Sequence, residues 1–346
     1  MTSLANDPVI AAAHGQRSNR TPVWFMRQAG RSLPEYRAVR GSGSILDAIK
    51  KPDLSAEITL QPVRRYGVDA AVLYSDIVVP AHAVSFGIDV APGTGPVAEK
   101  PFRTESDLTR LRELQPEDVS YVSDTVDLLV RELQIPLLAF AGAPFTVASY
   151  LIEGRPSRTY QNTKQLMRAN TALWHALMER LTQHSVTFIS TQISHGAEAF
   201  QLFDSWAGSL SRADYDTYVR PHSAQVFAQL RERHPNVPGI HFGIGCDHLI
   251  ESMNAVGNAV IGLDWRTPIR TARARLGNNT VVQGNLDPAL VLAGRDIAIA
   301  GANDVLADND GHPGHIFNLG HGVQPDTDPD VLHEIVKHVH ERTTRS

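Results

Sequence analysis

The sequence predicts an α/β fold, a single (β/α)8 TIM barrel, and three observations support this prediction. Short apolar runs rich in β-branched and aromatic residues recur eight times along the 346 residues. Stretches long enough to form helices lie between the runs, as parallel strands require for their crossover connections. The runs are apolar throughout rather than alternating, which is typical of strands covered on both faces.

The apolar runs define the strands that we expect, and helical spacing defines the segments between them. Leu166, Leu173, Leu177 and Leu181 recur at helical spacing ahead of the fourth run. The segment after the first run lacks the glycine-rich turn of an open, dinucleotide-binding sheet, which favours a barrel. The predicted strands are residues 23–26, 70–74, 137–141, 199–203, 239–242, 260–263, 281–283 and 316–319.

The connections carry three further predictions. Residues 78–136 are too many for a simple crossover, so we expect a small excursion there, with helices that start near Glu105 and Asp118. Residues 41–44 (GSGS) predict a loop or a helix N-cap. Residues 333–338 (HEIVKH) resemble a zinc-binding motif, but they are one residue too long to place both imidazoles on one helix face, so we expect a solvated C-terminal helix.

Composition limits the class of protein. We expect one domain over residues 1–346, with flexible ends at about residues 1–18 and 343–346, because no linker-like stretch divides the chain. Net charge is −5, from 37 acidic and 32 basic residues, which argues against a nucleic-acid or anionic-membrane partner. No apolar run approaches the roughly 20 residues of a membrane span, and no signal peptide is recognisable. We therefore expect a soluble, cytoplasmic protein.

The chain contains one cysteine, Cys246. An internal disulfide or a cysteine-based metal cluster therefore cannot form within this chain. A reducing compartment fits this cysteine usage.

Polar residues gather where the predicted strands end, which is where a barrel of this kind has its active site. Arg27 and Arg31 follow the first strand, and a helical turn there would place both on one face. Two guanidinium groups so placed repel one another unless an anion lies between them, and each presents donors that match a carboxylate. The alternative is that each arginine pairs with a protein carboxylate such as Glu35.

Asp76 comes at the end of the second predicted strand. Burial would raise the pKa of its carboxyl group unless cationic or N–H partners hold it ionised. Asp76 could transfer a proton, or it could present a fixed negative charge to a developing cation. The alternative is a helix N-cap.

Three neutral or titratable side chains, Tyr150, Ser205 and His321, follow later strands. The hydroxyl groups of Tyr150 and Ser205 suit carboxylate binding, although either could equally make a structural hydrogen bond. His321 lies between two glycines that permit tight turns, and such turns would present the imidazole to a pocket.

Seven blocks, in order from about residue 6 to residue 340, resemble the signatures of uroporphyrinogen decarboxylases. The two longest blocks hold the candidate residues Arg27, Arg31 and Tyr150. The blocks are residues 22–31 (PVWFMRQAGR), 141–154 (AGAPFTVASYLIEG), 74–77 (YSDI), 201–206 (QLFDSW), 262–265 (GLDW), 283–288 (QGNLDP) and 318–322 (NLGHG).

This resemblance implies a cofactor-independent carboxy-lyase of porphyrin and haem biosynthesis, with a (β/α)8 barrel, a homodimer, and no metal. Its implied reaction removes the four acetate carboxyl groups of uroporphyrinogen III and yields coproporphyrinogen III and CO2. Asp76, Arg27 and Arg31 would be catalytic. The implied substrate-binding residues are Arg27, Gln28, Ala29, Gly30, Arg31, Asp76, Tyr150, Ser205 and His321.

Two alternatives remain. A zinc-dependent methylcobalamin or thiol methyltransferase of the same superfamily would need a His-x-Cys pair and a second thiolate, but His241 is followed by Phe242 and Gly243, and Cys246 stands alone. A non-catalytic tetrapyrrole-binding protein would need the arginines, but it would not need Asp76 at the centre of the site.

Overall fold

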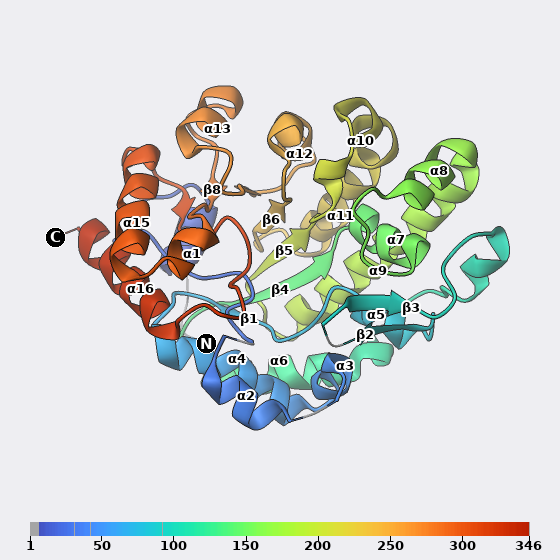
Figure 1. Cartoon of the computed structure of the whole chain (residues 1–346), viewed down its shortest axis with the longest axis horizontal. Coiled ribbons are helices and arrows are strands. Elements are labelled where there is room, and N and C mark those ends of the chain that lie inside the picture. Colours follow the sequence, from blue (N-terminus) through green and yellow to red (C-terminus); the bar gives the residue numbers. More distant parts are fainter. Residues whose placement is uncertain (1–6, 31, 42, 92, 346) are drawn as a thin grey trace.

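A curled parallel sheet with helices around it forms the body of the protein (Figure 1). A computed structural model of the chain describes residues 7–30, 32–41, 43–91 and 93–345. Within these residues the sheet has seven strands in the order β1-β4-β5-β6-β7-β8-β9. The strands are β1 (Ala71–Val72), β4 (Leu137–Gly142), β5 (Ala199–Phe203), β6 (Gly239–Phe242), β7 (Val260–Gly262), β8 (Val282–Gln283) and β9 (His315–Ile316).

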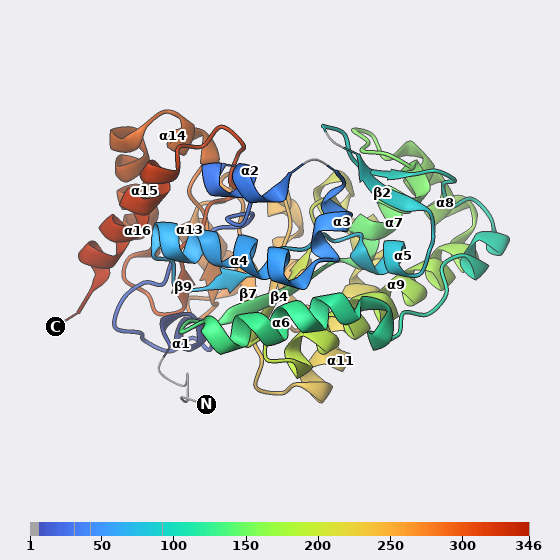
Figure 2. The same ribbon diagram turned by 90° about the horizontal axis from the view of Figure 1, so that it is seen from below.

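The helices run around the outside of the sheet in chain order, and the last long helix packs against the first (Figures 1 and 2). These two helices are α16 (Pro329–Thr343) and α4 (Pro52–Tyr66), and α6 (Ser120–Glu132) lies on the other side of α4. The others are α1 (Pro8–Ala13), α2 (Pro34–Arg40), α3 (Ile45–Ile49), α5 (Val79–Ala83), α7 (Pro144–Glu153), α8 (Gln161–Ala169), α9 (Thr171–Ser194), α10 (Arg212–Tyr218), α11 (Arg220–Arg233), α12 (Ile250–Asn254), α13 (Ile269–Leu276), α14 (Pro288–Leu292) and α15 (Arg295–Asn309).

Seven of the eight predicted strands are confirmed, and the prediction for residues 23–26 is wrong. That segment makes a single bridge, between Val23 and Phe317. Two of its N–H groups donate to side chains instead of a neighbouring strand: Phe25 N–H to Gln28 Oε1 at 2.9 Å, and Met26 N–H to Asn318 Oδ1 at 3.1 Å. Because side chains accept these N–H groups, the backbone pairing of a strand does not continue past Trp24.

Residues 22–24 nevertheless bond to backbone on both sides. Phe317 N–H donates to Pro22 O at 2.8 Å, and Asp69 N–H donates to Val23 O at 2.7 Å. Phe317 follows β9, and Asp69 precedes β1. The segment therefore lies between the two edge strands of the curled sheet.

A buried row of polar side chains crosses the interior between segments far apart in the sequence. Trp24 Nε1–H donates to Gln283 Oε1 at 3.0 Å, and Gln283 Nε2–H donates to Gln201 Oε1 at 2.7 Å. All three side chains are almost fully buried. Because an unpaired polar group there is costly, the bonds fix the relative positions of the first segment, β8 and β5.

The excursion between β1 and β4 is confirmed, and it contains an antiparallel hairpin, β2 (Ile88–Ala91) with β3 (Gly95–Ala98). The helix expected near Glu105 is only a 3₁₀ turn, η2 (Glu105–Thr109). Asp107 caps this turn by accepting from the N–H groups of Arg103 and Thr104, and the chain does not continue as a helix. The helix expected near Asp118 is present as the 3₁₀ helix η3 (Pro116–Val119), which leads into α6.

Two smaller predictions are also confirmed. Ser44 is the N-cap of α3, and its Oγ accepts from Leu46 N–H at 3.2 Å. Residues 333–338 lie in the helix α16, with His333 and Lys337 exposed. Among the described residues, every helix falls short of the length and hydropathy needed to cross a bilayer.

Candidate active site

The predicted site residues that the structure describes lie beyond the carboxyl ends of strands. Asp76 follows β1, Tyr150 belongs to the helix α7 that follows β4, Ser205 follows β5 and His321 follows β9. Because the carboxyl ends of parallel strands meet at one edge, these side chains are carried to the same rim.

Arg27 occupies a turn, and residues 26–30 are not helical, so the helical turn that would place Arg27 and Arg31 on one face is absent from the residues that the structure describes. The φ of Arg27 is 60°, in the left-handed region, which costs a non-glycine residue about 1–2 kcal/mol. The side chain is exposed and passes over Gly322: a β-carbon there would lie 2.5 Å from Arg27 Cδ. Arg31 lies outside the described residues.

The charge of Arg27 connects three of the predicted residues. It lowers the pKa of Asp76, the pKa of Tyr150 and the pKa of His321, although it is not the largest influence on any of them. Such effects fall off with distance, so the three side chains are grouped around this guanidinium.

The carboxyl group of Asp76 sits in a desolvated position. Burial is the largest influence and raises its pKa, and the Val78 N–H, the charge of Arg27 and the Ile77 N–H oppose this only in part. Val78 N–H donates to Asp76 Oδ1 at 3.0 Å, and the helix α5 begins one residue later with Val78 as its cap. Asp76 therefore supports the turn before α5, but it is not the N-cap.

Tyr150 packs beside Trp206, with ring centroids 5.6 Å apart. Burial, followed by the negative charge of Asp76, raises the pKa of Tyr150 to about 12, which keeps its hydroxyl group protonated at neutral pH. Ser205 is half-buried, and it is linked to this group through its chain neighbour Trp206.

A buried pair fixes Trp206. Thr146 Oγ1–H donates to Asp204 Oδ1 at 3.0 Å, and Trp206 N–H donates to Thr146 Oγ1 at 3.2 Å. Both Thr146 and Asp204 have no exposed surface. Thr146 lies one helical turn before Tyr150, so the pair sets α7 and the loop after β5 in a fixed relationship.

His321 has a defined tautomer. Gly322 N–H donates to His321 Nδ1 at 2.7 Å, so in the neutral ring the proton lies on Nε2. Burial first, and the charge of Arg27 second, lower the pKa of His321 and favour this neutral form. The ring therefore has one N–H donor, at Nε2.

After Arg27, the Gln28 side chain is bonded within the protein, whereas the N–H groups of the next two described residues are not. Gln28 is fully buried, and its amide group donates to Ala70 O at 2.9 Å while accepting from Phe25 N–H. Gln28 N–H itself donates to Phe25 O at 3.0 Å. Among the described residues, the N–H groups of Ala29 and Gly30 have no acceptor, so these two remain for a ligand.

Comparisons with known proteins identify the family. A model of the family described as "Uroporphyrinogen decarboxylase (URO-D)" matches residues 4–342. The chain belongs to the uroporphyrinogen decarboxylase family. It is 53% identical to the uroporphyrinogen decarboxylase of Salinispora tropica over 99% of this chain and 92% of that protein. It is 50% identical to the one of Streptomyces coelicolor over 99% of this chain and 97% of that protein.

A solved structure supports the fold. The methyltransferase from Methanosarcina mazei superposes with a TM-score of 0.80 over 97% of this chain and 98% of its own. At 16% sequence identity this likeness concerns the fold alone. A uroporphyrinogen decarboxylase family member thus shares its architecture with a methyltransferase.

The two residues weighed for the zinc-dependent alternative, His241 and Cys246, are packed in the interior. Cys246 is buried and free, and His241 is fully buried with its Nε2 3.7 Å from Asp204 Oδ2. Among the described residues, no three His, Cys, Asp or Glu side chains are grouped so that they could hold a metal ion.

One residue of the rim, Arg266, was missed by sequence reasoning, and Trp265 was noted after its strand without a role. Trp265 belongs to a signature block at the end of a predicted strand, and Arg266 follows directly. The Arg266 guanidinium lies 3.8 Å from the centre of the Trp265 ring, and the ring of His321 meets the same indole at 6.3 Å. The signal available in the sequence was a cation next to an aromatic residue at a strand end.

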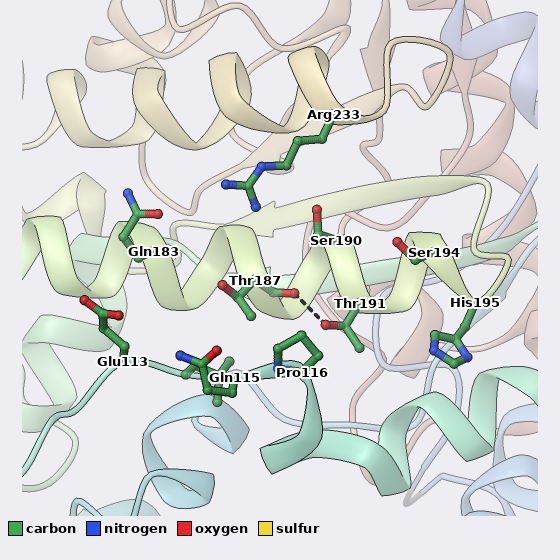
Figure 3. Close-up of a pocket in the computed structure, with 11 residues that line it drawn as sticks. Glu113, Gln115, Pro116, Gln183, Thr187, Ser190, Thr191, Ser194, His195 and Arg233 are labelled. Atoms are coloured by element: carbon green, nitrogen blue, oxygen red, sulfur yellow. Dashed lines mark hydrogen bonds between the residues drawn. The ribbon is translucent and has the colours of Figure 1, made fainter.

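A surface groove of about 490 Å³ lies elsewhere, in the outer helical layer (Figure 3). The polar face of α9, with Thr187, Ser190 and Ser194, forms one wall, and Arg233 reaches toward it from α11 (Figure 3). The C-terminus of α9 leads to the amino end of β5, which is the edge opposite the rim described above. The groove is therefore separate from the candidate active site.

Proposed function

We propose that this chain decarboxylates the acetate side chains of uroporphyrinogen III, giving coproporphyrinogen III and CO2 in tetrapyrrole (haem) biosynthesis. The observation that carries the proposal is that Asp76, Tyr150 and His321 follow the ends of β1, β4 and β9, with the Arg27 side chain passing over Gly322 beside His321. The charge of Arg27 acts on the pKa of all three side chains. The names of relatives at about 50% identity over the whole chain support the same activity. A polycarboxylate with a central array of N–H groups matches a rim that combines cations, hydroxyl groups and one desolvated carboxylate.

We also propose that the sheet closes into one (β/α)8 barrel formed by residues 1–346. The segment 22–24 would be its eighth staggered element, since it bonds to Phe317 beyond β9 and to Asp69 ahead of β1. Packing of α16 against α4 supports closure of the outer layer as well. A homodimer in the cytoplasm, with uroporphyrinogen as the small-molecule partner, completes the proposal.

The chemistry requires an electron sink, because loss of CO2 from an acetate leaves an electron pair on its methylene carbon. Protonation of the adjacent pyrrole at a ring α-carbon creates an iminium-like cation that accepts this pair as the carbon–carboxyl bond breaks. A proton then adds to the methylene group to form the methyl group, and loss of the α-carbon proton restores the pyrrole. The substrate itself supplies what a cofactor supplies in other decarboxylases.

Asp76 would stabilise the cationic ring and accept hydrogen bonds from the pyrrole N–H groups. Its charged form is disfavoured by burial in the free protein. A cation that develops beside a desolvated carboxylate is stabilised more than one beside a solvated carboxylate. The interaction therefore grows toward the transition state, as catalysis requires.

The remaining groups would bind the side-chain carboxylates. Arg27 and Arg31 would each offer a guanidinium group, and the N–H groups of Ala29 and Gly30 would add backbone donors next to Gln28. Tyr150, with a pKa of about 12, would donate from its hydroxyl group, as would Ser205. His321 would donate from Nε2.

An anaerobic assay with uroporphyrinogen III tests the proposal. Purified protein without added metal or cofactor should release CO2 in steps and accumulate coproporphyrinogen III. Chromatography of the oxidised porphyrins measures each product. Tight binding without loss of carboxyl groups would indicate a non-catalytic tetrapyrrole-binding protein. Activity only as a methyl transfer to a thiol, after addition of zinc, would indicate the methyltransferase alternative.

A further inference from the structure

Arg266 is held on the rim by stacking against Trp265. Its guanidinium lies 3.8 Å from the centre of the indole ring. The same indole also meets the ring of His321, edge to face at 6.3 Å. Trp265 thus contacts both Arg266 and His321, a side chain predicted to donate to a substrate carboxylate.

The loops that carry these residues are tightly joined. Gly320 lies against the backbone of Trp265, so closely that a β-carbon on Gly320 would overlap it. His321 follows this contact directly, and Gly322 then passes under the side chain of Arg27. These contacts join the loops of Arg27, His321 and Arg266 into one stretch of the rim.

The ion pair of Arg266 does not account for its position. Asp264 accepts from Gly245 N–H and, at 2.9 Å, from the backbone N–H of Arg266, so backbone donors satisfy both of its oxygens. The Arg266 Nη1 contact to Asp264 Oδ2, at 2.8 Å, is added to these. Asp264 is buried, but half of the arginine side chain, 51%, stays exposed, so solvent reaches the guanidinium and screens the pair in part.

The guanidinium keeps donors available. Within the described residues, Arg266 donates from its side chain only through Nη1, to Asp264. Nε–H and Nη2–H therefore remain for an anion. Stacking on Trp265 restricts the plane of the fork, so less side-chain freedom is lost when an anion binds.

We propose that Arg266 is a further carboxylate-binding residue of this enzyme, which together with His321 Nε2–H takes one side-chain carboxylate of the substrate. The inference rests on the proposed function, because it takes the ligand to be a polycarboxylate macrocycle. The positive charge of Arg266 also lowers the pKa of His321, as that of Arg27 does, which is consistent with a short distance between these groups.

The test compares two arginines of the same region. Arg266→Met keeps an unbranched apolar stem over Trp265 and removes the charge, while Arg270→Met removes a guanidinium that is 73% exposed and lies 3.7 Å from Asp308. We expect Arg266→Met to raise KM for uroporphyrinogen III about tenfold with kcat changed less, as for loss of one charge-assisted hydrogen bond. Arg270→Met should leave KM at its wild-type value.

Competition with coproporphyrinogen III identifies the carboxylate. An equal rise in Ki for this product supports the proposal and assigns the contact to a carboxylate that the product keeps. A rise in KM alone supports it too, and assigns the contact to an acetate. An unchanged KM in Arg266→Met overturns the proposal and leaves Arg266 as a partner of Asp264.

Further measurements distinguish substrate binding by Arg266 from a purely structural role of this side chain. If Arg266→Met does not fold, Arg266→Lys replaces it, and a KM equal to that of the wild type would then overturn a role for the planar fork. A lower melting temperature with an unchanged KM also counts against the proposal. Failure of the proposed function itself would be seen separately, as wild-type protein that converts no uroporphyrinogen.

Discussion

The side chain of Arg27 lies across Gly322, with its Cδ 2.5 Å and its Cγ 2.8 Å from where a β-carbon on that glycine would be. The two residues come from opposite ends of the chain, one from the segment between the edge strands and the other from the loop after β9. Gly322 is thus required for its small size, because a β-carbon at this position would overlap the Arg27 side chain.

The first prediction follows from this contact. Gly322→Ala should displace the Arg27 side chain and raise KM for uroporphyrinogen III about tenfold, since a charge-assisted contact is weakened. Steady-state kinetics measures this, and a thermal melt checks that the fold is kept. An unchanged KM would show that Arg27 is not held in place by this contact.

Removal of the Asp76 charge should affect turnover far more than binding. Asn at this position can still accept from the Val78 N–H, which donates to Asp76 Oδ1 at 3.0 Å, so the local turn is preserved. We expect kcat to fall about 100-fold or more, as for removal of one preorganised electrostatic partner, with KM changed much less. Near-normal turnover of Asp76→Asn would falsify the role of cation stabiliser.

The pH dependence should report the raised pKa of Asp76, which results chiefly from burial. The ionised form is the active one, so kcat/KM should fall on the acid side at a pH above about 3.9, the ordinary value for Asp. Because the pKa of Asp76 is higher in the folded than in the unfolded protein, its ionisation lowers the free energy of unfolding as pH rises through the folded-state pKa. Asp76→Asn should therefore unfold at a temperature no lower than wild type at pH 7. A kcat/KM that falls only at or below about pH 4 would contradict the raised pKa of Asp76.

The buried hydroxyl group of Thr146 should couple stability to activity. Thr146→Val keeps the shape but removes the donor to Asp204 Oδ1 and the acceptor of Trp206 N–H. We expect a loss of about 1–3 kcal/mol in the free energy of unfolding, because a buried carboxylate loses a partner, together with a lower kcat. Thr146→Ser, which keeps the hydroxyl group, is the control, and equal behaviour of both variants would argue against this link.

Asp69 joins the two ends of the chain. It accepts from Val23 N–H at 2.7 Å, from His340 Nε2 at 2.7 Å and from Arg20 Nη2 at 2.5 Å. Asp69→Ala should lower the free energy of unfolding by about 3 kcal/mol, measured by denaturant titration, because buried donors lose their acceptor. Asp124→Ala, an exposed position on α6, should have little effect.

The same carboxylate should show a defined pH dependence. Burial would raise the pKa of Asp69, but the His340 bond, the positive charges and the Val23 N–H outweigh it and lower the pKa. Its contribution is therefore present above the unfolded-state pKa of about 3.9 and is lost as pH falls through the lower, folded-state value. The difference between wild type and Asp69→Ala should shrink as pH falls below about 4, where the Asp69 carboxylate becomes protonated.

Much of the fold could be predicted from local pattern. Apolar runs located seven strands because a strand buried on both faces must be apolar along its whole length. The same logic failed for residues 23–26, where the run is equally apolar but Gln28 and Asn318 capture the N–H groups of Phe25 and Met26. Gln28 is near in the sequence but turns back onto Phe25 only in the folded chain, and Asn318 is brought to Met26 by the fold.

The sequence by itself determined the family, through a motif order that matches one family. It also predicted the candidate site residues: an aspartate after the second predicted strand, and an arginine, a tyrosine and a histidine after other predicted strands. Only the tertiary structure decided how they work together. The course of Arg27 across Gly322, the contact of His321 with Trp265 and the bond between Thr146 and Asp204 each join segments that are distant in the sequence. Local sequence specifies burial and periodicity, whereas contacts between distant segments arise only when the sheet curls and brings the strand ends together.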